Sequence, residues 1–284
     1  MFGTDYALPT VQVGDVRLYY ELKGAGDPLA LIGGSLFGRQ NFGLVYNKLV
    51  KHFRVLSYDQ RGYGKSDRPI EKYTIDMWAD DLAGLLDALK VKRAHVYGTS
   101  MGGMIALKFA AKYPEKTLGC VADVAFGKPD RMRKIIFSTW RKLAQAIGLG
   151  DLYSDYVLTQ AVGANFLDQA GVDRKIEMVR DVVRLNPVET VVQACLAMES
   201  LDLSKDLGRI RAPTLVMNAP GDYITPLDMG PSGIGGRKIA EMVPNSTLKV
   251  WEGIGHADLL EKPDESAATV IKSLKSVAKK EKAT

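Results

Sequence analysis

The sequence has few cysteines and histidines and contains no long apolar run. Its only cysteines, Cys120 and Cys195, are too few for a disulfide framework and lack the spacing of metal ligands. No apolar run reaches the roughly 18 residues that a membrane-spanning helix requires. Residues 1–10 lack the basic and apolar regions of a signal peptide. We therefore expect a cytoplasmic protein without stable membrane insertion.

The charge pattern argues against a nucleic-acid partner. The net charge is +5, but the basic residues form no stripe interleaved with aromatic side chains, as nucleic-acid-binding surfaces usually do. Apolar residues make up 46% of the chain, which is enough for one large core. The expected partner is therefore a small-molecule substrate, and the sequence leaves open whether the protein forms a homodimer.

Strand-like and helix-like segments alternate along most of the chain. Residues 11–22 (VQVGDVRLYYEL) alternate around a turn and predict an early hairpin. Further strands are expected at 29–34, 53–59, 94–98, 117–125, 212–219 and 246–252, with helices at 76–90, 104–113 and 264–278. This order predicts an α/β fold with a mostly parallel eight-stranded sheet covered by helices on both faces.

The alternation stops between residues 127 and 205. That region holds four helix-like segments, at 131–148, 154–163, 173–185 and 187–198. We therefore expect a core formed by residues 1–126 and 206–284, with residues 127–205 inserted as a helical cap.

Ser100 lies in the segment YGTSMGG, where a predicted strand passes into a predicted helix within a few residues. So tight a turn strains the central residue and requires small neighbours, which Gly98 and Gly102 provide. The turn would present the serine hydroxyl at the carboxyl end of the sheet, where open parallel sheets bind ligands. A glycine-rich turn with an incidental serine is the alternative, but the strand before it and the helix after it favour a nucleophile elbow.

A nucleophilic serine requires a base, and the chain contains three histidines. His52 precedes a strand and is expected at the surface, and His95 begins the strand of the elbow itself, too far back to reach Ser100. His256 lies in a glycine-flanked loop after the last predicted strand and is therefore the candidate base. Asp222, just past the end of another strand, is the candidate carboxylate that would orient it.

These motifs together resemble the α/β-hydrolase superfamily, in its capped branch with a serine nucleophile. The segments YDQRGYGKSDRP, GTSMGG and GHADLLEKP resemble the loop before the elbow, the elbow and the histidine loop of that family. The chain order Ser100, Asp222, His256 and the position of Asp222 before Pro226 also match. The resemblance covers nearly the whole chain and implies the α/β-hydrolase fold with no metal or organic cofactor.

One departure concerns the oxyanion hole. The family usually has His-Gly after its third strand, whereas this chain has Gly33-Gly34. The resemblance implies the backbone N–H groups of Ser35 and Met101 as oxyanion donors, with Leu36 as the alternative to Ser35. Backbone donors need no particular side chain, so the hole can form without the histidine, although the loop loses the support of that side chain.

The resemblance implies a serine hydrolase that cleaves a small or medium carboxylic ester, with an apolar acyl or alcohol part, through an acyl-enzyme. Leu36 and the apolar residues Phe137, Trp140 and Met198 are expected to contact the substrate, with packing inside the cap as the alternative for the last three. The same catalytic groups could open a lactone or hydrolyse a carbon–carbon bond in a ring-cleavage product. A ligand-binding receptor with slow turnover is the alternative from another class.

Overall fold

The computed structural model describes residues 9–281 of the chain. Residues 1–8, part of the segment in which no signal peptide is expected, lie outside the described residues. Two antiparallel strands, β1 (Thr10–Val13) and β2 (Val16–Lys23), begin the described part and form the predicted hairpin. Gly14 lies in their turn at φ 54°, a left-handed backbone that glycine adopts without a steric penalty.

Eight strands form one sheet in the order β1-β2-β4-β3-β5-β6-β7-β8. β2 pairs antiparallel with β1 and β4, and all other neighbouring strands are parallel. The strands are β3 (Pro28–Ile32), β4 (Arg54–Tyr58), β5 (Ala94–Thr99), β6 (Thr117–Asp123), β7 (Thr214–Asn218) and β8 (Ser246–Val250). The expected α/β fold with a mostly parallel eight-stranded sheet is thereby confirmed.

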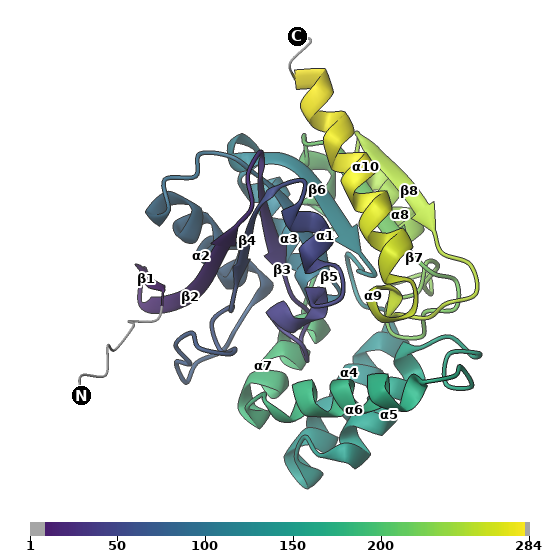
Figure 1. Cartoon of the computed structure of the whole chain (residues 1–284). Coiled ribbons are helices and arrows are strands. Elements are labelled where there is room, and N and C mark those ends of the chain that lie inside the picture. The colour runs from purple at the N-terminus through teal and green to yellow at the C-terminus, as the bar shows by residue number, and fades with distance from the viewer. Residues whose placement is uncertain (1–8, 282–284) are drawn as a thin grey trace, which may run out of the picture.

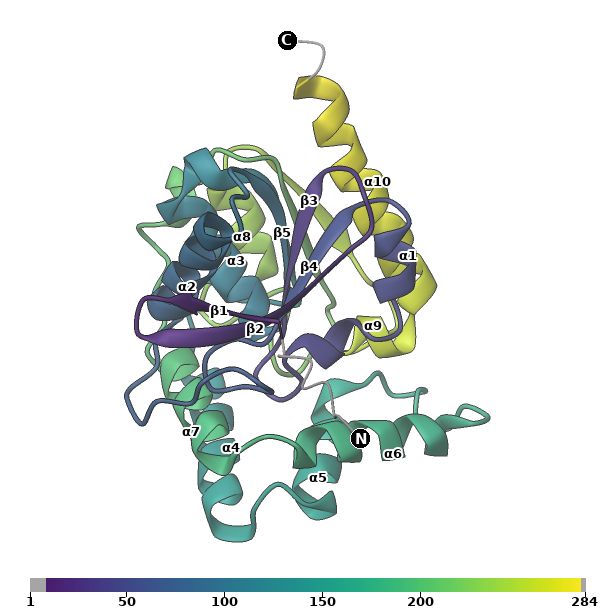
Figure 2. The same ribbon diagram turned by 60° about the vertical axis from the view of Figure 1, so that its left-hand side comes forward.

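Helices cover both faces of this sheet. Figure 2 shows α2, α3 and α8 on one face and α1 and α10 on the other. Along β3, Ala30 and Ile32 belong to the hydrophobic cluster on the side of α3. Leu29 and Leu31 belong to the cluster that includes residues of α1 and α10. Burial on both faces explains why the parallel strands are almost continuously apolar.

The helices of the core are α1 (Tyr46–Val50), α2 (Ile75–Ala88), α3 (Met101–Lys112), α8 (Gly236–Met242), α9 (Asp258–Glu261) and α10 (Pro263–Glu281). Short 3-10 helices are η1 (Arg39–Phe42), η2 (Pro114–Lys116) and η3 (Leu207–Arg209). Between residues 9 and 281, no helix combines the length and the apolar character needed to cross a bilayer.

The helices between β6 and β7 lie beyond the carboxyl ends of the parallel strands (Figure 1). They are α4 (Arg131–Ile147), α5 (Asp151–Ala161), α6 (Val172–Arg184) and α7 (Val188–Glu199). Each overlaps one of the four segments that the sequence predicts as helical, although α5 begins earlier than expected. Asp130 precedes α4, and its carboxylate accepts the backbone N–H of Arg133 at 2.8 Å and so caps the helix. This group of helices faces the edge of the sheet where β5 turns into α3.

Ser100 occupies that turn with a left-handed backbone, at φ 57° and ψ −124°. Such a conformation is strained for a residue with a side chain, and it persists only where the surroundings enforce it. Here the chain passes itself very closely: a Cβ atom on Gly98 would lie 1.9 Å from the carbonyl oxygen of Gly102. A Cβ atom on Gly102 would lie 2.0 Å from the carbonyl oxygen of Ile32. Both positions therefore require glycine.

We predict that Gly98→Ala lowers the free energy of unfolding by about 3 kcal/mol or more, because the added methyl group meets backbone atoms that cannot move independently. Gly208→Ala is the matched control, because a Cβ atom on Gly208 meets nothing within 4 Å. Urea denaturation of the two variants measures the difference. Equal stabilities would show that the close approach at the turn is not a constraint.

Candidate active site

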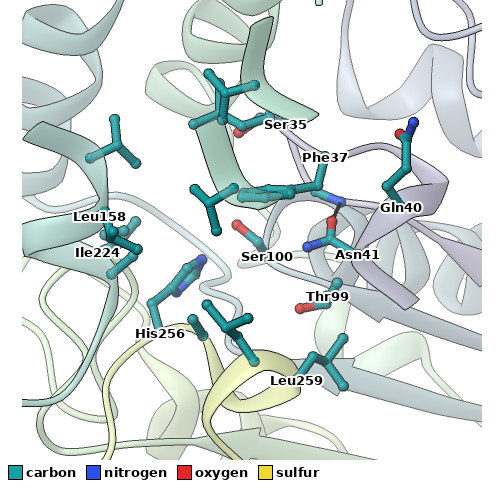
Figure 3. A pocket seen from close by; sticks show the side chains of 18 of the residues that line it. Ser35, Phe37, Gln40, Asn41, Thr99, Ser100, Leu158, Ile224, His256 and Leu259 are labelled. Atoms are coloured by element: carbon teal, nitrogen blue, oxygen red, sulfur yellow. Dashed lines mark hydrogen bonds between the residues drawn. The ribbon is translucent and has the colours of Figure 1, made fainter. Parts of the chain in front are cut away.

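Ser100 and His256 line the same pocket, which encloses ≈ 140 Å³ between the carboxyl edge of the sheet and helices α4–α6. Ser100 comes from the turn between β5 and α3, and His256 comes from the loop between β8 and α9. Figure 3 shows the imidazole of His256 directed towards the Ser100 side chain. Two residues separated by half of the chain thus meet because their strands end at one edge of the sheet.

Asp222 holds the far side of this imidazole. Its Oδ2 lies 2.8 Å from Nδ1 of His256. An ionised carboxylate can only accept a hydrogen bond, so Nδ1 carries the proton and donates it to Asp222. The lone pair then resides on Nε2, on the side of the ring away from Asp222. Asp222 thereby selects the tautomer in which His256 can accept a proton.

Several hydrogen bonds keep Asp222 ionised although its side chain is buried. Burial alone would raise its pKa, but the attraction and hydrogen bond of His256 and the hydrogen bonds of Thr225 hold the pKa below its usual value. The backbone N–H groups of Ile224 and Thr225 both donate to Oδ1 at 2.8 Å. A carboxylate with this many donors remains charged at neutral pH.

Thr225 is a member of this hydrogen-bond network that the sequence patterns did not indicate. Its Oγ1 lies 2.6 Å from Asp222 Oδ2, 2.6 Å from the carbonyl oxygen of Val124 and 3.1 Å from Nδ1 of His256. A hydroxyl group has one proton to donate, so it can serve only one of the two oxygen acceptors at a time. Thr225 therefore links the carboxylate and the imidazole to the end of β6.

Two segments next to Ser100 and along the pocket contain backbone N–H groups without a hydrogen-bond acceptor among residues 9–281. Met101 is the first residue of α3, so its N–H has no acceptor within the helix. The N–H groups of Ser35 and Leu36 donate no hydrogen bond to another group between residues 9 and 281. In contrast, the Gly34 N–H donates to Asn41 Oδ1 at 2.7 Å. The structure thus leaves Ser35 and Leu36, the two alternatives expected from the sequence, as possible donors opposite Met101.

Side chains from distant segments hold the loop that carries these donors. The carbonyl oxygen of Gly33 accepts the amide N–H of Gln60 at 2.9 Å, and that of Ser35 accepts the hydroxyl of Tyr63 at 2.9 Å. Asn186, which follows α6, donates to the carbonyl oxygen of Leu36 at 2.6 Å. Because these carbonyl oxygens accept hydrogen bonds from other segments, the loop is held in place while the N–H groups of Ser35 and Leu36 stay without an acceptor.

The same loop explains why glycine stands where the family usually has histidine. A Cβ atom on Gly33 would lie 1.8 Å from the carbonyl oxygen of Gly38. Gly38 bonds back to the loop through its own N–H, which donates to the carbonyl oxygen of Gly34 at 3.1 Å. A side chain at position 33 would break this tight turn. The loop therefore relies on Gln60, Tyr63 and Asn186 for support.

The residues expected to contact a substrate divide into two groups. Leu36 and Trp140 line the pocket, together with apolar residues of α5 and α6. Phe137 and Met198 do not line it and are almost completely buried. Phe137 packs its ring against Phe126 and Trp140, with centroids 5.8 and 5.7 Å away. These two side chains contribute to packing around the pocket, the alternative that the sequence left open.

The other two histidines lie away from the pocket. His52 is exposed after α1, as expected. His95 is buried in β5, and its ring lies 6.0 Å from that of Phe53 in an edge-to-face arrangement. Neither lines the cavity that contains Ser100. His256 is therefore the histidine that shares a pocket with Ser100.

The end of α5 is bonded directly to the loop of His256. The N–H groups of His256 and Ala257 both donate to the carbonyl oxygen of Ala161, at 2.7 and 2.9 Å. The carboxylate of Glu261 accepts the Gly255 N–H at 2.9 Å and the Gly163 N–H at 3.1 Å. Displacement of α5 would therefore also disturb the position of His256.

Comparison with known proteins agrees with the observed fold. The sequence model of a family described as the alpha/beta hydrolase fold matches residues 31–263. A protein of Caulobacter sp. (strain K31), assigned by name to the carbamate hydrolases (RutD), is 29% identical over 269 residues. That alignment covers 92% of this chain and 97% of the relative.

Two solved structures extend the comparison. The enol-lactonase from Burkholderia xenovorans LB400 has a TM-score of 0.85 and 25% identity, covering 94% of this chain and 100% of its own. A thermophilic esterase from Thermogutta terrifontis has a TM-score of 0.82 and 26% identity, covering 95% of this chain and 97% of its own. The names of these three relatives indicate a carbamate, an enol-lactone and an ester as substrates, so the comparison by itself does not select a substrate.

We predict that Tyr63→Phe lowers kcat roughly 10-fold, because the carbonyl oxygen of Ser35 loses its donor and the loop with the two N–H groups becomes less ordered. Tyr73→Phe is the matched control, since the Tyr73 hydroxyl donates to the carbonyl oxygen of Pro69 at 2.8 Å, outside this loop. Steady-state hydrolysis measures the kcat of both variants, and urea denaturation corrects for any loss of folded protein. If the two variants lose kcat equally, the Tyr63 hydrogen bond has no specific role in the site.

Proposed function

The chain belongs to the α/β-hydrolase family and is a hydrolase, and on that premise we propose that it cleaves carboxylic esters through an acyl-enzyme on Ser100. One observation carries the proposal: His256 lines the pocket of Ser100 while its Nδ1 is held at 2.8 Å by the buried carboxylate of Asp222. That pairing provides a base for a hydroxyl group that is otherwise a weak nucleophile at neutral pH.

In the first half of the reaction, Oγ of Ser100 attacks the ester carbonyl while Nε2 of His256 takes its proton. The carbonyl oxygen becomes an oxyanion, which the N–H groups of Met101 and Ser35 would stabilise, with Leu36 as the alternative to Ser35. Losing one such donor typically raises the barrier by about 3 kcal/mol. The imidazolium then gives its proton to the departing alcohol oxygen, and the acyl-enzyme remains.

In the second half, water replaces the alcohol. His256 accepts a proton from the water molecule as its oxygen attacks the acyl carbon, and the same N–H groups stabilise the second oxyanion. Return of that proton to Oγ of Ser100 releases the carboxylic acid and restores the enzyme. The negative charge of Asp222 stabilises the imidazolium in both halves without itself accepting the proton.

We also propose that residues 127–205 act as a cap over a core made of residues 1–126 and 206–284. Helices α4, α5 and α6 supply Trp140, Leu158 and Val179 to the pocket wall opposite Ser100. These contacts support a role in substrate selection. The hydrogen bonds of Ala161 and Asn186 would couple the cap to the histidine loop and to the oxyanion loop.

An ester is supported as the substrate because the pocket is small and largely apolar and carries the groups that acyl transfer requires. Lactone opening uses the same groups, and the resemblance to an enol-lactonase structure keeps it as the second candidate. The hydrogen bonds of Asp222 with Thr225 and His256 hold the imidazole in the tautomer that accepts a proton, which supports a hydrolase over a receptor with slow turnover.

We predict that the protein hydrolyses short 4-nitrophenyl esters and that Ser100→Ala reduces kcat to the background level. Asp222→Asn should lower kcat by about 10⁴-fold, because an amide can donate to Nδ1 and so favours the wrong imidazole tautomer. A parallel panel of lactones and carbamates, assayed with the same variants, ranks the substrate classes. Equal hydrolysis by the wild type and Ser100→Ala would exclude Ser100 as the nucleophile.

A further inference from the structure

The pocket of Ser100 contains almost no charge apart from the catalytic groups. No lysine or arginine is among the described residues that line it, and its acidic member is Asp258, whose side chain is almost completely buried. Behind His256, the ionised Asp222 adds a negative charge close to the cavity. The pocket therefore offers no cation to a bound anion and places negative charge near its reacting end.

Two arginines on elements that form the pocket, Arg39 and Arg180, are paired with carboxylates elsewhere. Arg39 in η1 bonds to Glu21 at 2.8 Å and to Asp59 at 3.1 Å. Arg180 in α6 bonds to Asp155 at 2.7 Å and to Glu177 at 2.6 Å. An arginine that already has two carboxylate partners has little remaining attraction for a substrate carboxylate.

The polar side chains on the cap side of the pocket are also satisfied within the protein. The Ser154 hydroxyl donates to the carbonyl oxygen of Gly150 at 3.0 Å, and the Trp140 indole N–H donates to Gln160 at 3.2 Å. What remains facing the cavity from the cap is hydrocarbon, chiefly Val157, Leu158, Val179 and Val183. Burying a charge against such a wall without a partner is strongly unfavourable.

Polar groups concentrate instead on the core side, close to Ser100. Asn41 accepts the Gly34 N–H through Oδ1, so its amide nitrogen faces the other way, and Figure 3 shows it turned towards Ser100. Thr99, which precedes Ser100, and Gln40 also line the cavity. The pocket thus has uncharged polar side chains that line it near Ser100, with Asp222 behind His256, and an apolar end under α4–α6.

We infer that this site selects substrates whose acyl part is uncharged and discriminates against substrates that carry a carboxylate at the far end of that part. The inference rests on the proposed ester hydrolysis and narrows it to one substrate class. Discrimination arises because a carboxylate would lose hydration under the cap without gaining a cation there, whereas a hydrocarbon chain gains from the same burial.

Three 4-nitrophenyl esters of similar chain length separate charge from size: the hexanoate, the adipate monoester with its free carboxylate, and the methyl ester of that adipate monoester. We predict a kcat/KM at least about 100-fold lower for the free carboxylate than for either uncharged ester. Equal kcat/KM for the adipate monoester and its methyl ester would overturn the inference.

A charge added to the pocket wall provides the complementary test. Met178 lines the pocket from α6 and is 40% exposed, so Met178→Lys can be accommodated. This variant should reduce the discrimination by about 10-fold or more, because the ammonium group can pair with the substrate carboxylate. Met132→Lys is the matched control: Met132 is 47% exposed on α4 and does not line the pocket. A reduction of the same size in both variants would contradict a local effect of charge.

Binding to Ser100→Ala, measured by calorimetry, separates this inference from the proposed function. If no ester is hydrolysed in a Ser100-dependent manner, the proposed function fails, and tighter binding of the methyl ester than of the free adipate monoester still supports the inference. If hydrolysis depends on Ser100 but the variant binds the two adipate esters equally, the proposed function stands and the inference fails.

Discussion

The strained backbone of Ser100 is the constraint on which the rest of the site depends. Its left-handed conformation is enforced because β5 passes into α3 where Gly98, Gly102 and Ile32 approach one another at distances that no Cβ atom tolerates. The strained turn orients the side chain of Ser100 towards the cavity. Met101, whose backbone N–H has no acceptor in the helix, follows Ser100 directly as the first residue of α3. The neighbouring loops need only bring a base and a second donor to this fixed point.

Those two loops are held by hydrogen bonds that span the whole chain. The loop of His256 is fixed by Asp222 on one side and by the carbonyl oxygen of Ala161 on the other. The loop of Ser35 is fixed from behind by Tyr63 and, through Leu36, by Asn186. Ala161 and Asn186 both belong to the helical segment between β6 and β7. The position of that segment and the geometry around Ser100 are therefore coupled.

Much of the fold could be predicted from local patterns. Alternating residues identified the early hairpin, and short apolar runs identified the other strands, because strands buried on both faces are apolar along their whole length. The side chains of Asp222 and His256 could be placed at the pocket edge because each directly follows such a strand. Local patterns indicate well where a strand ends, and the residues of this site follow the ends of β5, β7 and β8.

The residues that the patterns missed act through contacts between distant segments. Tyr63, Gln60 and Asn186 support a loop that begins at Gly33, and nothing in their own segments indicates this role. Thr225 lies next to Pro226 in a turn, and only its position beside Asp222 and His256 gives it significance. Equally, whether an apolar residue such as Phe137 faces the pocket or the interior depends on how α4 packs, which its amphipathic pattern alone does not determine.

A crystal structure of the protein inactivated by an alkyl phosphonate ester tests the central claim most directly, because the phosphonyl group mimics the tetrahedral oxyanion. The account predicts a covalent bond from phosphorus to Oγ of Ser100, with the phosphonyl oxygen within about 3 Å of the N–H groups of Met101 and of Ser35 or Leu36. An adduct on another residue, or a phosphonyl oxygen turned away from these N–H groups, would contradict it.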